Sequence, residues 1–189
     1  PVLEPSGSSG DSWRPNSTSS AAATAGDAGR QGSSPNTELL RKIRRLGIQW
    51  VAADALDSLN NRNNTLYRAL SQANLVNLAT HGELRAKAPM SSTSVEARSG
   101  AGQPSKYISF TRSRAVAAHF ATAKSDSTGI VGVFDMTVYL FNQEAIIWRP
   151  WDHMVNDFAI EQAQDEFEVL ITGPVPISAM RSMYSVGGP

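Results

Sequence analysis

The spacing of apolar residues along this chain predicts the order of its helices and strands. From residue 37 to residue 59, apolar side chains recur at about 3.6-residue intervals, which predicts a helix with a break at Gly47. Ser113 is a suitable N-cap for a second helix, which the pattern carries to about Lys124. Short apolar or alternating runs predict strands at residues 65–70, 107–111, 129–141, 144–148, 168–172 and 180–186, with the longest of them interrupted near Asp135.

These predicted elements are unevenly distributed along the chain. Helices gather near the start of the sequence and strands near its end, and no regular β-α-β alternation is present. This order predicts an α+β fold with a mixed or antiparallel sheet. Residues 88–105 are rich in Ser, Gly and Pro, and we expect them to form a long surface loop.

The composition of the chain changes near residue 36. Residues 1–36 consist mostly of Ser, Gly, Ala and Pro, with Trp13 as their one aromatic residue. Such a segment buries too little apolar surface to offset the cost of ordering its backbone, so we expect a low-complexity N-terminal tail. Residues 37–189 have the composition of one folded domain.

Charge and residue types exclude several classes of function. The 17 basic and 17 acidic residues give a net charge of zero, so we expect no nucleic acid or other polyanion as a partner. The sequence has no cysteine, and its three histidines are far apart without a ligand spacing, so we expect no metal site and no thiol nucleophile. No apolar run reaches the roughly 18 residues that span a bilayer, so we expect no membrane partner.

Two glutamates stand directly before an apolar strand. Glu166 and Glu168 are separated by Phe167 alone, and because side chains alternate between the faces of a strand, both carboxylates can point into one volume. Paired carboxylates suit chemistry at a sugar carbon, where one stabilises positive charge and the other moves a proton. The same pattern is also typical of a solvated strand end.

Two earlier strands carry polar residues of their own. Arg68 lies inside an otherwise apolar run, where an edge position or half of an ion pair is the plain explanation. Ser109 and Thr111 lie two residues apart and therefore share one strand face, as in many half-exposed strands. Phe110, between them, is expected to face the other way and pack in the core.

This ordered set resembles the arginine–serine–glutamate class of mono-ADP-ribosyltransferases, which contains cholera-type toxins, vertebrate arginine-specific transferases and bacterial effectors. Leu66-Tyr67-Arg68-Ala69 resembles the arginine motif of the first strand, and Ser109-Phe110-Thr111 resembles the Ser-Thr-Ser strand, with Phe and Thr in its last two places. Glu166-Phe167-Glu168-Val169-Leu170-Ile171 resembles the Glu-x-Glu signature of the arginine-specific members. The resemblance spans about residues 37–186.

The resemblance implies a fold and a reaction. The implied fold is an ADP-ribosyltransferase-like core, a mixed or antiparallel β-sandwich with N-terminal helices. The implied reaction transfers ADP-ribose from NAD, as co-substrate and without a metal, to an arginine side chain of a host protein. The resemblance further implies a bacterial effector or toxin that is secreted into a host cell, and the Ser- and Gly-rich tail is similar to the often disordered secretion signals of such effectors.

By the same resemblance, each motif residue receives a role. Glu168 would be the catalytic glutamate, which stabilises positive charge at the anomeric carbon of NAD, and Ser109 would orient it. Arg68 would hold NAD through a phosphate or a ribose, with Ser109 and Thr111 as further members of that NAD site. Glu166 would bind the incoming arginine and accept its proton.

Two other functions are open from the sequence. One is a catalytically impaired transferase-fold effector that binds arginine-containing peptides in its glutamate-lined groove through carboxylate–guanidinium pairs. The other is an unrelated α+β interaction domain in which Arg68, Ser109 and Glu168 lie far apart.

Four further residues carry expectations. If the glutamates form an arginine-binding groove, Arg14 or Arg30 of the N-terminal tail is a candidate occupant, with ordinary surface packing of the tail as the alternative. Trp148 and Trp151 lie in a segment that matches no nicotinamide-binding loop. We expect both to be core residues, with stacking on a ligand as the alternative.

Overall fold

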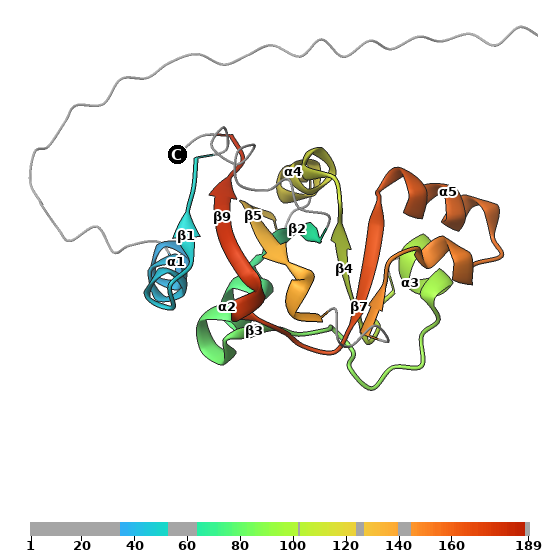
Figure 1. Ribbon diagram of the computed structural model, residues 1–189, viewed down its shortest axis with the longest axis horizontal. Coiled ribbons are helices and arrows are strands. Elements are labelled where there is room, and N and C mark those ends of the chain that lie inside the picture. The colour runs from blue at the N-terminus through green and yellow to red at the C-terminus, as the bar shows by residue number, and fades with distance from the viewer. Residues whose placement is uncertain (1–34, 53–63, 102, 124–126, 140–144, 188–189) are drawn as a thin grey trace, which may run out of the picture. The chain divides into compact units, whose positions relative to one another are not determined.

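Figure 1 shows the computed structural model of this protein, which describes residues 35–52, 64–101, 103–123, 127–139 and 145–187. The low-complexity tail predicted for residues 1–36 lies outside these ranges apart from its last two residues, and Arg14 and Arg30 lie outside them as well. The expectations about the tail and its arginines therefore stay predictions.

Seven strands of the described residues form one sheet with the order β1-β9-β5-β2-β4-β7-β6. β1 runs parallel to β9, and the other pairings in this sheet are antiparallel. The mixed and mostly antiparallel sheet confirms the predicted α+β class. The strands of the sheet are β1 (Gln49–Trp50), β2 (Thr65–Ser71), β4 (Tyr107–Thr111), β5 (Ser127–Asp135), β6 (Ile146–Ile147), β7 (Glu168–Thr172) and β9 (Met180–Ser185), while β3 (Glu83–Leu84) and β8 (Val175–Pro176) pair as a separate ribbon.

Between β2 and β4 the sheet is almost divided (Figure 1). These two strands pair at a single position, Tyr67 with Thr111, whereas β2 pairs with β5 along its whole length. We predicted a β-sandwich, and the described strands instead form one sheet in two parts, β1-β9-β5-β2 and β4-β7-β6. Where the strands separate, the backbone groups of β4 need other partners than β2.

The helices are spread through the described residues, so the prediction that they gather near the N-terminus is wrong. They are α1 (Pro35–Arg45), α2 (Gln72–His81), α3 (Val95–Ala101), α4 (Arg114–Ala123) and α5 (Asp157–Asp165), with 3-10 turns η2 (Met136–Tyr139), η4 (Pro150–His153) and η5 (Ile177–Ala179). As predicted, Ser113 caps α4, because its Oγ accepts a hydrogen bond from the backbone N–H of Val116 at 3.3 Å.

Two predicted segments differ from the structure. The helix predicted for residues 37–59 ends at Arg45, because Gly47 adopts a φ of 90° and turns the chain into β1; residues 53–63 lie outside the described part. The surface loop predicted for residues 88–105 contains helix α3, and Ser99 and Ser105 within it are buried. Ser94 is the N-cap of α3, because its Oγ accepts a hydrogen bond from the backbone N–H of Ala97 at 3.1 Å. The prediction from composition missed this N-cap.

Strand β5 is buried on both faces, which explains its long apolar run. Val131 and Val133 pack against Ala117 and Ala121 of α4, while Phe134 faces the main core. The main core is completed by side chains of the helices α1 and α2 and by those of the strands β2, β4, β7 and β9. Phe110 is 3 % exposed and meets the ring of Phe134 edge-on at 5.1 Å, as predicted for the side of β4 that faces the core.

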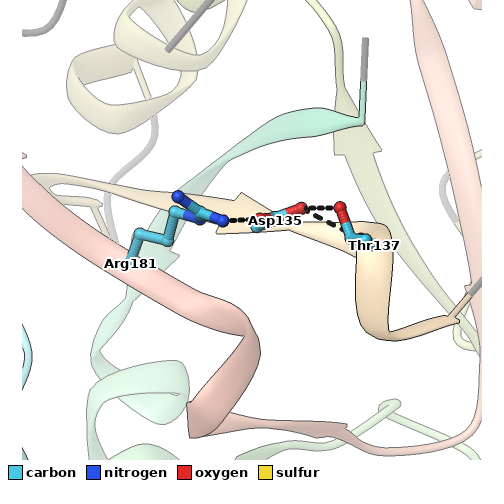
Figure 2. Close-up of polar contacts among 3 residues, drawn as sticks. All are labelled: Asp135, Thr137 and Arg181. Carbon is cyan, nitrogen blue, oxygen red and sulfur yellow. Dashed lines mark hydrogen bonds and ion pairs between the residues drawn. The ribbon is translucent and has the colours of Figure 1, made fainter. Parts of the chain in front are cut away.

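The strand predicted for residues 129–141 ends at Asp135, where we predicted its interruption, and Met136–Tyr139 form the turn η2 instead of further strand. At this end of β5, Asp135 joins two other elements (Figure 2). Its Oδ1 accepts the backbone N–H of Thr137 at 3.0 Å and the Thr137 hydroxyl, and its Oδ2 pairs with the guanidinium of Arg181. The β5–β9 register shifts at this place, so that Arg181 has no partner residue across the ladder. Such a bulge re-aims a side chain, and here it directs Arg181 onto the buried carboxylate.

Replacing Asp135 with Asn is expected to lower the free energy of unfolding by about 1–2 kcal/mol, because a charge-assisted pair with a largely buried carboxylate is lost. Chemical denaturation measures this change. The matched control is Glu38→Gln, which removes the exposed pair with Arg41 and is expected to cost less than about 0.5 kcal/mol. Equal effects of the two substitutions would show that the Asp135–Arg181 pair contributes no more to the free energy of unfolding than an exposed ion pair does.

Candidate active site

A cavity of about 760 Å³ opens where β2 and β4 separate, and residues of α2, α3, α4 and α5 contribute to its wall. Its volume lies within the roughly 300–1,000 Å³ of typical ligand sites. All five residues predicted from the sequence line this one cavity: Arg68, Ser109, Thr111, Glu166 and Glu168. The near-division of the sheet therefore creates the space in which the polar residues of three strands meet.

Glu168 is a buried carboxylate at the start of β7, with 3 % of its surface exposed. The hydroxyl of Ser109 donates a hydrogen bond to its Oε1 at 2.6 Å, and the hydroxyl of Ser99 donates to its Oε2. Thr111 lies directly opposite Glu168 across the β4–β7 ladder, so Ser109, two residues before it, is a diagonal neighbour on the same face. The strand register thus places the Ser109 hydroxyl, and helix α3 places the Ser99 hydroxyl.

Sequence reasoning missed Ser99. It lies in the segment that we predicted to be a surface loop, and no motif links it to Glu168, which is 69 residues away. Packing of α3 against α5 brings it to the site, and Glu96 of α3 fixes this arrangement by accepting the backbone N–H groups of Val155 at 2.6 Å and Asn156 at 3.2 Å. Only the tertiary structure carries this information.

Arg68 bridges the two strands where their ladder ends. Its Nη1 donates a hydrogen bond to the backbone oxygen of Ser109, and its Nε donates to Oδ1 of Asn74 at 3.3 Å. The guanidinium thus supplies to β4 a donor that β2 no longer provides. Through the Ser109 residue, Arg68 and Glu168 belong to one continuous hydrogen-bonded set.

The electrostatic environment of Arg68 favours an anionic ligand. Burial, and then repulsion by Arg98, lower the pKa of the Arg68 guanidinium from its ordinary value to about 10, although Glu168 opposes the shift. Arg68 is thus cationic at neutral pH in surroundings that disfavour its charge, which lowers the stability of the folded state. This destabilisation decreases only as the pH rises above about 10, where Arg68 loses its proton. An anion between Arg68 and Arg98 would remove the repulsion.

The charges around the cavity come from different elements. Four cationic residues line it, and they are contributed by β2, by the segment after β3 and by α3: Arg68, Arg85, Lys87 and Arg98. Its two carboxylates, Glu166 and Glu168, stand at the junction of α5 and β7. A cavity with a cationic excess and a carboxylate pair suits a ligand with an anionic part and a part that becomes positively charged.

Both glutamates point into one volume, as predicted, but the predicted reason, the alternation of side chains along a strand, is wrong. Glu166 is the C-terminal cap of α5 and has a helical backbone conformation, and Phe167 follows it with a φ of 50°. The chain therefore turns sharply between the two glutamates, and this turn, not strand alternation, brings both to the cavity. Positive φ costs a non-glycine residue free energy and is concentrated at functional sites.

Thr111 fixes this turn. Its hydroxyl donates a hydrogen bond to the backbone oxygen of Glu166 at 2.6 Å and accepts the backbone N–H of Ser113 at 2.9 Å. The side chain of Glu166 accepts a hydrogen bond from Nε2 of Gln162 at 3.1 Å. Thr111 thus acts on the loop that carries the glutamates, whereas Ser109 touches a glutamate directly.

Trp148 and Trp151 do not line the cavity. Trp148 packs partly buried against the main core, and Trp151 packs against Met154, Ala159 and Ala163 beside α5. Both tryptophans are therefore partly buried side chains that pack on the core clusters, which bears out the expectation in part.

The described residues include no group of three or more His, Asp or Glu side chains that could hold a metal ion. Among the same residues, no helix is long and apolar enough to cross a membrane. A comparison with protein-family models and with curated proteins finds no match.

The expectation that Arg68, Ser109 and Glu168 are scattered in the alternative interaction domain is wrong, because these three residues lie in one hydrogen-bonded set.

Proposed function

We propose that this protein is a mono-ADP-ribosyltransferase that transfers ADP-ribose from NAD to an arginine side chain of a protein. The observation that carries the proposal is Glu168, a carboxylate buried in the wall of a cationic cavity and held at both oxygens by Ser109 and Ser99. The proposal includes the transferase-like fold, supported by the positions of Arg68, Ser109 and Glu168 on β2, β4 and β7, which are neighbours in the sheet.

The proposed reaction breaks one bond and forms one. The bond between the nicotinamide nitrogen and the anomeric carbon breaks, and the cationic nicotinamide ring leaves as a neutral molecule with the bonding electrons. The anomeric carbon then resembles an oxocarbenium ion, whose positive charge Glu168 stabilises as carboxylates do in glycoside hydrolysis. A nitrogen of the acceptor guanidinium forms the new bond to this carbon, and its proton passes to Glu166.

The cavity supplies complementary groups for both substrates. The cations Arg68 and Arg98 suit the pyrophosphate of NAD, because a fixed guanidinium matches phosphate oxygens. Free guanidinium has a pKa above about 12, so an acceptor arginine attacks only if a base takes its proton. Glu166 suits that role, because it lines the same cavity as Glu168 and a hydrogen bond to Gln162 orients it.

Calorimetry with NAD tests the binding part of this proposal. We expect saturable binding in the micromolar to millimolar range, weakened about fivefold in Arg98→Gln because one charge near the pyrophosphate is lost. The affinity should stay constant up to about pH 9, since Arg68 remains cationic until its pKa of about 10. Arg41→Gln, on the exposed face of α1, is the matched control and should bind like the wild type. Absence of saturable binding at millimolar NAD would contradict the proposal.

One observation favours a second function. Both oxygens of Glu168 already accept hydroxyl hydrogen bonds, and the carboxylate is 3 % exposed, so a ribose hydroxyl must compete with Ser99 for it. If the ribose hydroxyl of NAD does not displace the Ser99 hydroxyl from Glu168, the protein is an arginine-peptide-binding module with a transferase-like cavity. Retained affinity for an arginine peptide without any NAD binding would identify this function.

A further inference from the structure

Helix α5 has a buried face and an exposed face with different chemistry. Ala159 and Ala163 are buried, whereas the exposed side follows the spacing i, i+3, i+4, i+7 of one helix stripe. This stripe lines an open groove of about 310 Å³ that we call the α5 groove, formed by Phe158, Glu161, Gln162, Asp165 and Glu166. Phe158 is 68 % exposed, and a large aromatic side chain in that position contributes little to folding.

The α5 groove is acidic, because three of its five residues carry a carboxylate. No described residue forms an ion pair with Glu161 or Asp165, although like charges four residues apart on a helix repel each other. The sequence has no lysine or arginine between Arg149 and Arg181, so this face departs from the neutral balance of the whole chain. A cationic partner would offset the repulsion.

The α5 groove is continuous with the cavity. Gln162 and Glu166 line both spaces. From Phe158 to Asp165 the stripe extends about 10 Å along the helix, which three to four residues of an extended chain cover. A peptide whose arginine reaches Glu166 therefore has room to lay its neighbouring residues on α5.

We propose that the α5 groove docks the segment of the acceptor protein that flanks the modified arginine. This inference rests on the proposed function, because it places the acceptor arginine at Glu166. The occupant is a basic segment with lysine or arginine within a few residues of the acceptor and one apolar side chain that packs on Phe158. The acidic face repels phosphate backbones and anionic membranes, so the partner is a protein.

The test compares two acceptors in NAD-dependent labelling. One is arginine methyl ester, which presents a guanidinium and no flanking residues, and the other is a peptide with one arginine, one leucine and several lysines. Glu161→Lys is expected to lower labelling of the peptide about fivefold and leave that of the ester unchanged, because it acts on flanking charges alone. Phe158→Ser should likewise affect only the peptide. Glu38→Lys on α1 makes the same charge change away from the groove and should affect neither acceptor.

Fluorescence anisotropy of the labelled peptide without NAD measures docking independently of chemistry. We expect weaker binding in Glu161→Lys, an effect that added salt reduces, and unchanged binding in Glu38→Lys. If the wild type labels neither acceptor, the proposed function fails, and the anisotropy result alone decides whether the groove binds the peptide. Equal affinity and equal peptide labelling in the wild type and Glu161→Lys would overturn the inference, as would an equal loss for both acceptors.

Discussion

Replacing Glu168 with Gln is expected to lower the rate of nicotinamide release from NAD by about 10³-fold. The amide keeps the size of the side chain and accepts a hydrogen bond from one of the two serine hydroxyls, but it carries no charge to stabilise an oxocarbenium ion. Groups that act on charge in the transition state mainly change the rate of reaction, so NAD affinity should change by less than about threefold. Nicotinamide release under saturating NAD measures the first effect and calorimetry the second.

Glu38→Gln serves as the control for this experiment, because it makes the same chemical change on the exposed surface of α1. It should release nicotinamide at the wild-type rate. Thermal unfolding of Glu168→Gln shows whether the buried carboxylate has been replaced without loss of the fold. A folded Glu168→Gln protein that keeps more than a tenth of the wild-type rate would contradict the catalytic role of Glu168.

Glu166→Gln is expected to separate two reactions of the same site. Transfer to arginine should fall by at least about 10²-fold, because a guanidinium attacks only after a base has taken its proton. Cleavage of NAD by water should stay within a few-fold of the wild type, since water attacks through a free lone pair before it loses a proton. The ratio of ADP-ribosylated peptide to free ADP-ribose in one reaction mixture measures the separation.

The opposite pattern would reassign Glu166. If transfer and hydrolysis fall by the same factor, this residue stabilises the transition state shared by both reactions or supports the fold of the turn at Phe167. The second explanation predicts a lowered melting temperature, and the first does not.

The strands β4 and β7 of the site were predictable from the sequence, because buried strand faces leave a regular pattern of apolar residues. The predicted strand 168–172 coincides with β7, and 107–111 with β4, since apolar side chains bury one or both faces of each. The alternation of side chains along a strand also predicted correctly that Ser109 and Phe110 face opposite sides of β4, with Phe110 in the core. The positions of β4 and β7 in the sequence thus follow from local patterns.

The remaining features of the site depend on contacts distant in sequence. The seven residues of α3 carry too short a pattern for periodicity, and its contact between Ser99 and Glu168 requires the packing of α3 on α5. The turn at Phe167 requires a positive φ, which the sequence does not signal because the residue is not glycine. The cavity itself results from the single pairing of β2 with β4, which no local pattern encodes.

The most direct test of the central claim is the mass of an arginine-containing peptide after incubation with this protein and NAD. We predict the gain of one ADP-ribosyl group, located on the guanidinium by fragmentation, with wild-type protein and its absence with Glu168→Gln. An unchanged peptide mass at millimolar NAD with folded wild-type protein would contradict the claim, and so would the same mass gain with Glu168→Gln.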